Sequence, residues 1–232
     1  MSEIPPVPPP APTPAAAPGL PWEEPNAGLG SILPTAGQLI RSPFQAFSKM
    51  SLTVDLIRPI AYFVAFTLVA ALFNQIWSFV FHDTLVRLVR GMAGPQFESF
   101  APMFEKPGLM QVVLGFVVAP LIMIVLLFVW TALVHVVLLM VGGAKGGFAA
   151  TLRAICYAET AQVATVIPIL GGLIAFFWRL ILQMIGLSEA HRTDAWRAVI
   201  AVLAPLFVCC LCAIGLGIAF GAALMQVLQQ AR

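Results

Sequence analysis

The sequence predicts an all-α fold: a polytopic membrane protein with a bundle of five transmembrane helices, interfacial helices and a disordered N-terminal tail. Of its 232 residues, 60% are hydrophobic and only 9% are charged, against about 25% charged residues in a typical soluble domain. So few charged side chains cannot cover the surface of a soluble domain of this length. Long stretches also lack Asp, Glu, Lys and Arg altogether, and the net charge of +2 is too small to indicate a nucleic-acid partner.

The N-terminal part divides into two regions. Residues 1–34 contain more than half of the 19 prolines and show no apolar period, which predicts a disordered Pro-rich tail. Residues 35–58 combine apolar side chains at helical spacing with the basic residues Arg41, Lys49 and Arg58. This pattern predicts an amphipathic juxtamembrane helix, broken near Pro43, that lies on the membrane surface.

Residues 59–228 are predicted to form the five-helix transmembrane domain. A hydrocarbon core of about 30 Å requires about 20 helical residues per crossing. In the long apolar stretch 154–188, the turn signal of Pro168 followed by Gly171 and Gly172 separates two crossings of a helical hairpin. The predicted crossings are about 60–81, 110–140, 151–168, 171–188 and 198–224.

The distribution of basic residues predicts the orientation. If the N-terminus is inside, more Lys and Arg residues flank the inner ends of these crossings than the outer ends. Because positive flanks favour the cytoplasmic side, we expect an integral protein of the bacterial cytoplasmic (inner) membrane. Its N-terminus is expected in the cytoplasm and its C-terminus outside.

Two ionisable residues fall inside the predicted hairpin. Glu159 and Arg179 lie at similar distances before and after the turn, so antiparallel helices would bring them to a similar depth. An ionised group in hydrocarbon costs at least about 2.5–3.5 kcal/mol and needs a partner or water. The pair is expected to be an internal ion pair that locks the hairpin, or part of a binding or proton pathway that also includes His135 in the second crossing. The third alternative is that the two side chains make no contact.

The last crossing contains a small-residue pattern and three cysteines. Ala213, Gly217 and Gly221 recur every four residues, which predicts a helix-packing stripe for the bundle or for a second copy of the chain. Of the cysteines at 209, 210 and 212, only the first and last share a helix face, and no His or acid joins them. We therefore expect no metal site.

No catalytic constellation is recognisable in the sequence. It contains no Gly-x-Ser-x-Gly or His-Glu-x-x-His motif and no convergent set of titratable residues. We therefore expect neither an enzyme nor a bound cofactor.

Several segments resemble the Yip family (Rab/Ypt-interacting proteins, YIPF in animals), specifically its bacterial branch. The resemblance covers most of the chain from about residue 20 to 215. It is carried by residues 21–23 (Pro-Trp-Glu), 42–47 (Ser-Pro-Phe-Gln-Ala-Phe), 141–153, 167–172 (Ile-Pro-Ile-Leu-Gly-Gly) and 185–191 (Ile-Gly-Leu-Ser-Glu-Ala-His).

This resemblance implies five transmembrane helices and a cytoplasmic N-terminus. Eukaryotic members of the family are membrane-traffic adaptors that engage prenylated Rab GTPases and one another. They tend to have a Tyr-Gly motif where residues 156–159 of this chain read Cys-Tyr-Ala-Glu, so the resemblance implies no Rab-type partner here.

Two functions follow as hypotheses. The first is a non-catalytic membrane scaffold that contacts membrane lipids, binds a protein partner through the N-terminal tail, or forms a homo-oligomer through the last helix. The alternative is a small carrier or channel for an ion, lipid or small solute that uses Glu159 and Arg179.

Overall fold

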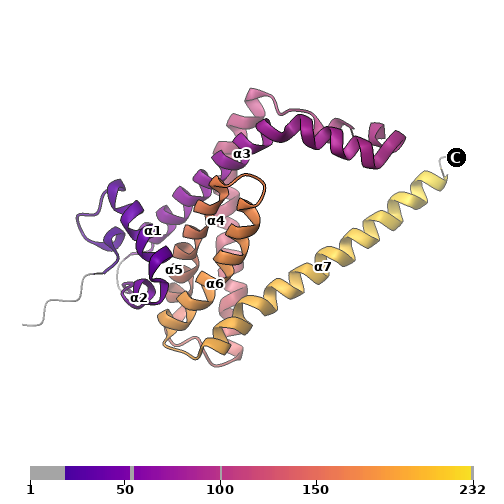
Figure 1. The fold of residues 1–232 in the computed structure, drawn as a ribbon. Coiled ribbons are helices and arrows are strands. Elements are labelled where there is room, and N and C mark those ends of the chain that lie inside the picture. The colour runs from indigo at the N-terminus through magenta and orange to yellow at the C-terminus, as the bar shows by residue number, and fades with distance from the viewer. Residues whose placement is uncertain (1–18, 53–54, 100, 231–232) are drawn as a thin grey trace, which may run out of the picture.

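The protein is built from α-helices joined by short 3-10 helices (Figure 1). The computed structural model describes residues 19–52, 55–99 and 101–230, and these ranges contain no strand. The α-helices are α1 (Ile32–Arg41), α2 (Pro43–Ser48), α3 (Ile57–Ala93), α4 (Leu109–Met140), α5 (Gly147–Ala158), α6 (Gly171–His191) and α7 (Ala195–Gln230). The 3-10 helices are η1 (Pro21–Glu23), η2 (Leu29–Ser31), η3 (Gly94–Ser99), η4 (Ala101–Phe104) and η5 (Glu159–Val166). The predicted all-α class is confirmed.

Within the described ranges, four helices are long and apolar enough to cross a membrane. They are α3, α4, α6 and residues Ala195–Gly221 of α7. Most of their apolar side chains point outward and are covered by no other part of the chain, as expected for surfaces that face lipid. The protein is therefore an integral membrane protein, and the predicted count of five such helices is one too high.

The predicted crossing 151–168 is the one that forms no long apolar helix in the structure. This stretch consists of the α-helix α5 followed by the 3-10 helix η5. Within it, the hydroxyl of Thr160 donates to the carbonyl of Tyr157 at 2.8 Å, and the hydroxyl of Thr165 donates to that of Gln162 at 2.7 Å. Such local side-chain bonds compete with regular α-helical hydrogen bonding. Polar side chains thus interrupt an otherwise apolar segment.

The other predicted crossings lie inside longer helices. The prediction 60–81 falls within α3, which continues to Ala93 and ends at Gly94, where φ is +55°. The last crossing, 198–224, falls within α7 in the same way. The predicted bounds mark the apolar residues that could lie in the hydrocarbon core. The observed helices continue past these residues, because a helix ends only where the backbone leaves the helical conformation. Figure 1 shows the C-terminal parts of α3 and α7 extending away from the central helices.

The N-terminal region also differs from the prediction. Residues 1–18 of the predicted tail 1–34 lie outside the described residues, whereas residues 19–34 form η1, η2 and the start of α1. The amphipathic helix predicted over 35–58, with a break near Pro43, is divided into α1 and α2 at Ser42, and its last residues begin α3. We call residues 19–52 the N-terminal segment.

The core lies where the N-terminal segment meets α3, α5 and α6. Phe47 of α2 is 1% exposed and lies over Gly186 of α6, where an added Cβ would be 2.8 Å from the Phe47 ring. Between α3 and η5, the hydroxyls of the fully buried residues Tyr62 and Thr160 are 2.7 Å apart. The N-terminal segment is therefore an integral part of the packed core.

Candidate functional site

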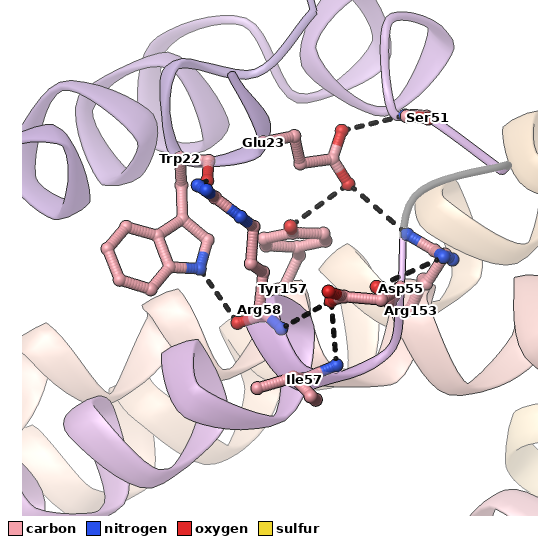
Figure 2. Close-up of polar contacts among 8 residues, drawn as sticks. All are labelled: Trp22, Glu23, Ser51, Asp55, Ile57, Arg58, Arg153 and Tyr157. Carbon is pink, nitrogen blue, oxygen red and sulfur yellow. Dashed lines mark hydrogen bonds and ion pairs between the residues drawn. The ribbon is translucent and has the colours of Figure 1, made fainter. Parts of the chain in front are cut away.

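The N-terminal segment is held to α5 by three buried polar side chains, Glu23, Arg153 and Tyr157, which we call the polar anchor (Figure 2). The hydroxyl of Tyr157 donates to Oε1 of Glu23 at 3.0 Å. The backbone N–H of Ser51 donates to the other carboxyl oxygen at 2.7 Å. One carboxyl group thus joins η1, the end of the N-terminal segment and α5.

Arg153 supplies the positive charge of the polar anchor. Its side chain is 2% exposed, and its Nη1 lies 3.7 Å from Oε1 of Glu23. Nη2 donates to the backbone carbonyl of Asp55 at 3.2 Å. Because removing a charge from water costs several kcal/mol, a buried guanidinium needs the carboxylate and the carbonyl that the N-terminal region brings to it.

Burial raises the pKa of the Glu23 carboxyl above its ordinary value. The Ser51 N–H, the Tyr157 hydroxyl and the Arg153 charge each oppose this rise, in decreasing order, but burial has the largest effect. The carboxyl therefore accepts a proton more readily in the folded protein than in the unfolded chain.

A second set of hydrogen bonds fixes η1 to the first turn of α3. The indole N–H of Trp22 donates to the carbonyl of Arg58 at 2.7 Å. The Arg58 guanidinium in turn donates to the carbonyls of Trp22 at 2.8 Å and Pro25 at 3.1 Å. Asp55 accepts from the N–H groups of Ile57 and Arg58 at 3.1 and 3.3 Å, which stabilises the start of α3.

The structure brings Glu159 and Arg179 together as an ion pair. Nη1 of Arg179 lies 3.4 Å from Oε2 of Glu159. The Glu159 side chain is 5% exposed and that of Arg179 is 34% exposed. Gln162 donates to the other Glu159 oxygen at 2.9 Å. The pair lies on a groove of about 330 Å³ whose remaining lining is mostly apolar and includes Trp130, with the amide of Gln183 as a further polar group.

His135 belongs to a different cluster from this ion pair. Its Nδ1 is 2.8 Å from the Thr151 hydroxyl, which is 2.9 Å from Nε2 of His191. The N–H of Gly146 donates to Nδ1 of His191 at 2.9 Å. His135 therefore helps to join α4, α5 and the end of α6, and it does not line the groove beside Glu159.

The predicted turn residues lie where η5 meets α6: Pro168 is in the connection, and Gly171 and Gly172 are the first residues of α6. The N–H of Leu170 donates to the carbonyl of Pro168 at 2.7 Å, and Ile169 has φ of +66°. An added Cβ at Gly171 would collide with the carbonyl oxygen of Ala164, whereas one at Gly172 would meet no atom within 4 Å. Of the two glycines, only Gly171 makes a close backbone approach.

The predicted helix-packing stripe contacts no other element. Ala213, Gly217 and Gly221 are all exposed on α7, and an added Cβ at either glycine would meet nothing within 4 Å. The side chains of Cys209, Cys210 and Cys212 are exposed as well. Across the described residues, no group of three or more His, Cys, Asp or Glu side chains could hold a metal ion.

The polar anchor is the part of the site that the sequence did not predict. Glu23 and Tyr157 are 134 positions apart, and no periodic pattern relates them. One signal was present: Arg153 stands in an otherwise apolar run from Phe148 to Ala158, where an unpaired charge is unfavourable. The segment Pro-Trp-Glu at 21–23 was noted only as part of a family resemblance.

Comparison with known proteins identifies the family. A family model described as the Yip1 domain matches residues 37–217, which is most of the chain. No curated protein and no solved structure matches the sequence. The match covers α2 to α6 completely, together with the second half of α1 and most of α7. The chain belongs to the Yip1 domain family.

Proposed function

We propose that the protein is a non-catalytic scaffold of the bacterial cytoplasmic membrane that presents its N-terminal segment to a protein partner at the membrane surface. The polar anchor is the observation that carries this proposal. It commits a buried carboxyl and a buried guanidinium to holding the segment in place. In this proposal the N-terminus is cytoplasmic, the C-terminus is outside, and α7 is a further contact for a second copy.

Held in this way, the segment has a defined outer surface. One side of α1 and α2 is buried through Leu39 and Phe47, while Leu33, Phe44 and Lys49 are exposed. A pre-ordered surface binds a partner without the entropic cost of ordering a free chain. This is the advantage that a scaffold would gain from the anchor.

The test uses the full chain, purified in discs of native lipid, with mass spectrometry of the proteins that accompany it. We expect a partner in fixed ratio to the wild type and to the Glu24→Ala variant, since Glu24 is exposed. We expect the Glu23→Ala variant to lose that partner. A partner that binds Glu23→Ala and wild type equally would contradict the proposed role of the segment.

A second candidate function, a carrier for an ion, lipid or small solute, is favoured by one specific observation. The Glu159–Arg179 ion pair borders a groove of about 330 Å³ within helices that face lipid. Intramembrane charges beside a cavity are typical of transport pathways. Flux into liposomes that the Glu159→Gln variant abolishes would support the carrier and overturn the scaffold, whereas no flux over a broad solute panel would exclude it.

A further inference from the structure

A concave surface lies between α1 and α2, on the exposed side of the N-terminal segment. Its volume is about 540 Å³, within the range of about 300–1,000 Å³ that is usual for small-molecule sites. Most of its polar lining can donate hydrogen bonds. The donors are Gln38, Arg41, Ser42, Gln45 and Lys49.

The charge of this concave surface is entirely positive. Arg41 and Lys49 are its only charged lining residues, and no Asp or Glu lines it. Among the described residues, neither side chain forms an ion pair or a hydrogen bond. Arg and Lys side chains that converge with amide and hydroxyl donors match the oxygens of a phosphate group.

Leu33 lines this surface, and other exposed apolar side chains stand elsewhere on the same segment. Leu33 and Phe44 are 76% and 59% exposed, and Leu29, one helical turn before Leu33, is 80% exposed. Basic residues beside protruding Leu and Phe side chains are typical of helices that lie in the membrane interface. A soluble phosphate would leave these apolar side chains in water, whereas a phospholipid would cover them with its acyl chains.

The position of the segment suits a lipid ligand. Trp22 and Arg58 bond the segment to the first turn of α3, a helix apolar enough to cross the membrane. Phe47 fixes α2 against Gly186, near the end of α6. Figure 1 shows α1 and α2 beside the central helices at the level where α3 begins. The concave surface therefore lies beside the start of a helix apolar enough to cross the membrane, where lipid headgroups are expected.

We propose that the concave surface between α1 and α2 binds the phosphate-containing headgroup of an anionic phospholipid. Arg41 and Lys49 contact the phosphate, and Leu33 and Phe44 contact the acyl chains. This site goes beyond the scaffold function and does not depend on it, because lipid binding needs no protein partner.

The experiment is native mass spectrometry of the full chain in detergent, titrated with phosphatidylglycerol or with phosphatidylcholine. We expect the wild type to bind phosphatidylglycerol preferentially. Each basic residue near a membrane surface contributes about 1 kcal/mol to binding of anionic lipid, so the double variant Arg41→Gln/Lys49→Gln should bind it about tenfold or more weakly. The charge-preserving variant Arg41→Lys/Lys49→Arg should bind within a few-fold of the wild type.

The matched control is Lys145→Gln/Arg192→Gln, which removes the same charge from two exposed residues outside the site. We expect this control to bind phosphatidylglycerol like the wild type. Equal weakening in both double variants would overturn the proposal, because it would indicate a general charge effect. All four sites are exposed, and unchanged thermal unfolding would verify that the variants fold.

A competition arm distinguishes the source of the phosphate. We expect glycerol phosphate or inorganic phosphate to displace the lipid poorly, because neither covers Leu33 and Phe44. We also expect Leu33→Ser/Phe44→Ser to weaken phosphatidylglycerol binding. Displacement by free phosphate at low concentration, or equal binding of both lipids by the wild type, would overturn the assignment to an anionic phospholipid.

Discussion

The carboxyl of Glu23 joins three parts of the chain through a few atoms. It accepts from the Ser51 N–H and the Tyr157 hydroxyl and faces Arg153. Its neighbour Glu24 is exposed. Glu23 is thus buried and Glu24 is exposed, although they are adjacent residues of the same type. Comparing the same substitution at both positions therefore isolates the effect of burial.

We expect the Glu23→Ala variant to unfold more easily than the wild type and the Glu24→Ala variant to behave like the wild type. Glu23→Ala removes the acceptor of the buried Tyr157 hydroxyl and that of the part-buried Ser51 N–H. A buried donor that finds no other acceptor costs about 1–3 kcal/mol. Glu23→Gln keeps one acceptor oxygen and should be affected less than Glu23→Ala. Thermal unfolding of the full chain in detergent checks this, and equal midpoints for Glu23→Ala and Glu24→Ala would contradict it.

The raised pKa of Glu23 makes the attachment of the segment depend on pH. A raised folded-state pKa means that the folded protein binds the proton more tightly than the unfolded chain. The stabilisation is fully present below the ordinary pKa of 4.5 and is lost as the pH rises through the folded-state value.

The distance between spin labels on α2 and α6 measures this attachment. We expect the distribution of that distance to broaden as the pH rises through this window. The Glu23→Gln variant, which cannot titrate at this position, should show no such change. A distribution that narrows as the pH rises would mean that the ion pair with Arg153 outweighs the effect of burial.

At the scale of elements, the path from α5 through η5 to α6 is fixed by one close backbone approach. Gly171 begins α6 against the carbonyl of Ala164, while Gly172 faces open space. The sequence marked both glycines as parts of one turn. The structure shows that only Gly171 must lack a side chain, because a Cβ atom there would collide with the backbone of Ala164.

We expect Gly171→Ala to lower the free energy of unfolding by about 1–3 kcal/mol, the usual cost of overpacking. Gly172→Ala should be neutral or slightly stabilising, because alanine favours a helix over glycine by about 1 kcal/mol where space permits. Unfolding midpoints of the two variants provide the comparison. Equal destabilisation by both would show that backbone flexibility at this turn, and not the approach to Ala164, is what matters.

The same elements show what sequence reasoning could and could not reach. Counting residues from the turn near residue 170 was enough to predict that Glu159 and Arg179 meet, because the connection between η5 and α6 is short. The count assumed an α-helix before the turn, where the structure has the 3-10 helix η5. The contact between Glu23 and Tyr157 could not be predicted from the sequence, because no local sequence pattern indicates which residues far apart in the chain come into contact. His135 was grouped with the ion pair on residue type alone, and its actual partners depend on how α4 packs against α5.

At the scale of the whole molecule, the two turns that flank the α5–α6 hairpin lie together. Arg197 donates to the carbonyl of Gly142 at 2.8 Å, and Gly146 donates to His191 at 2.9 Å. Both turns therefore lie at the same end of the helices that they connect. The turn at Ile169 lies at the opposite end of α6, and we expect it on the other side of the membrane, although α5 and η5 form no continuous apolar helix.

We expect single cysteines at positions 145 and 192 to react with a membrane-impermeant maleimide from the same side, and one at position 169 from the opposite side. The native residues Lys145, Ile169 and Arg192 are all exposed. The background is a variant in which the four native cysteines are replaced. Labelling of positions 145 and 169 from one side would contradict a chain that traverses the membrane through α5 and η5.

The most direct test of the central claim, that the polar anchor fixes the N-terminal segment on the membrane helices, is hydrogen exchange of the full chain in lipid discs. We predict slow exchange for the N–H groups of Ser51 and Trp22, which donate to Glu23 and Thr35. Residues 19–52 should exchange much faster in Glu23→Ala and remain protected in Glu24→Ala. Fast exchange across 19–52 in the wild type, as in a free chain, would contradict the claim.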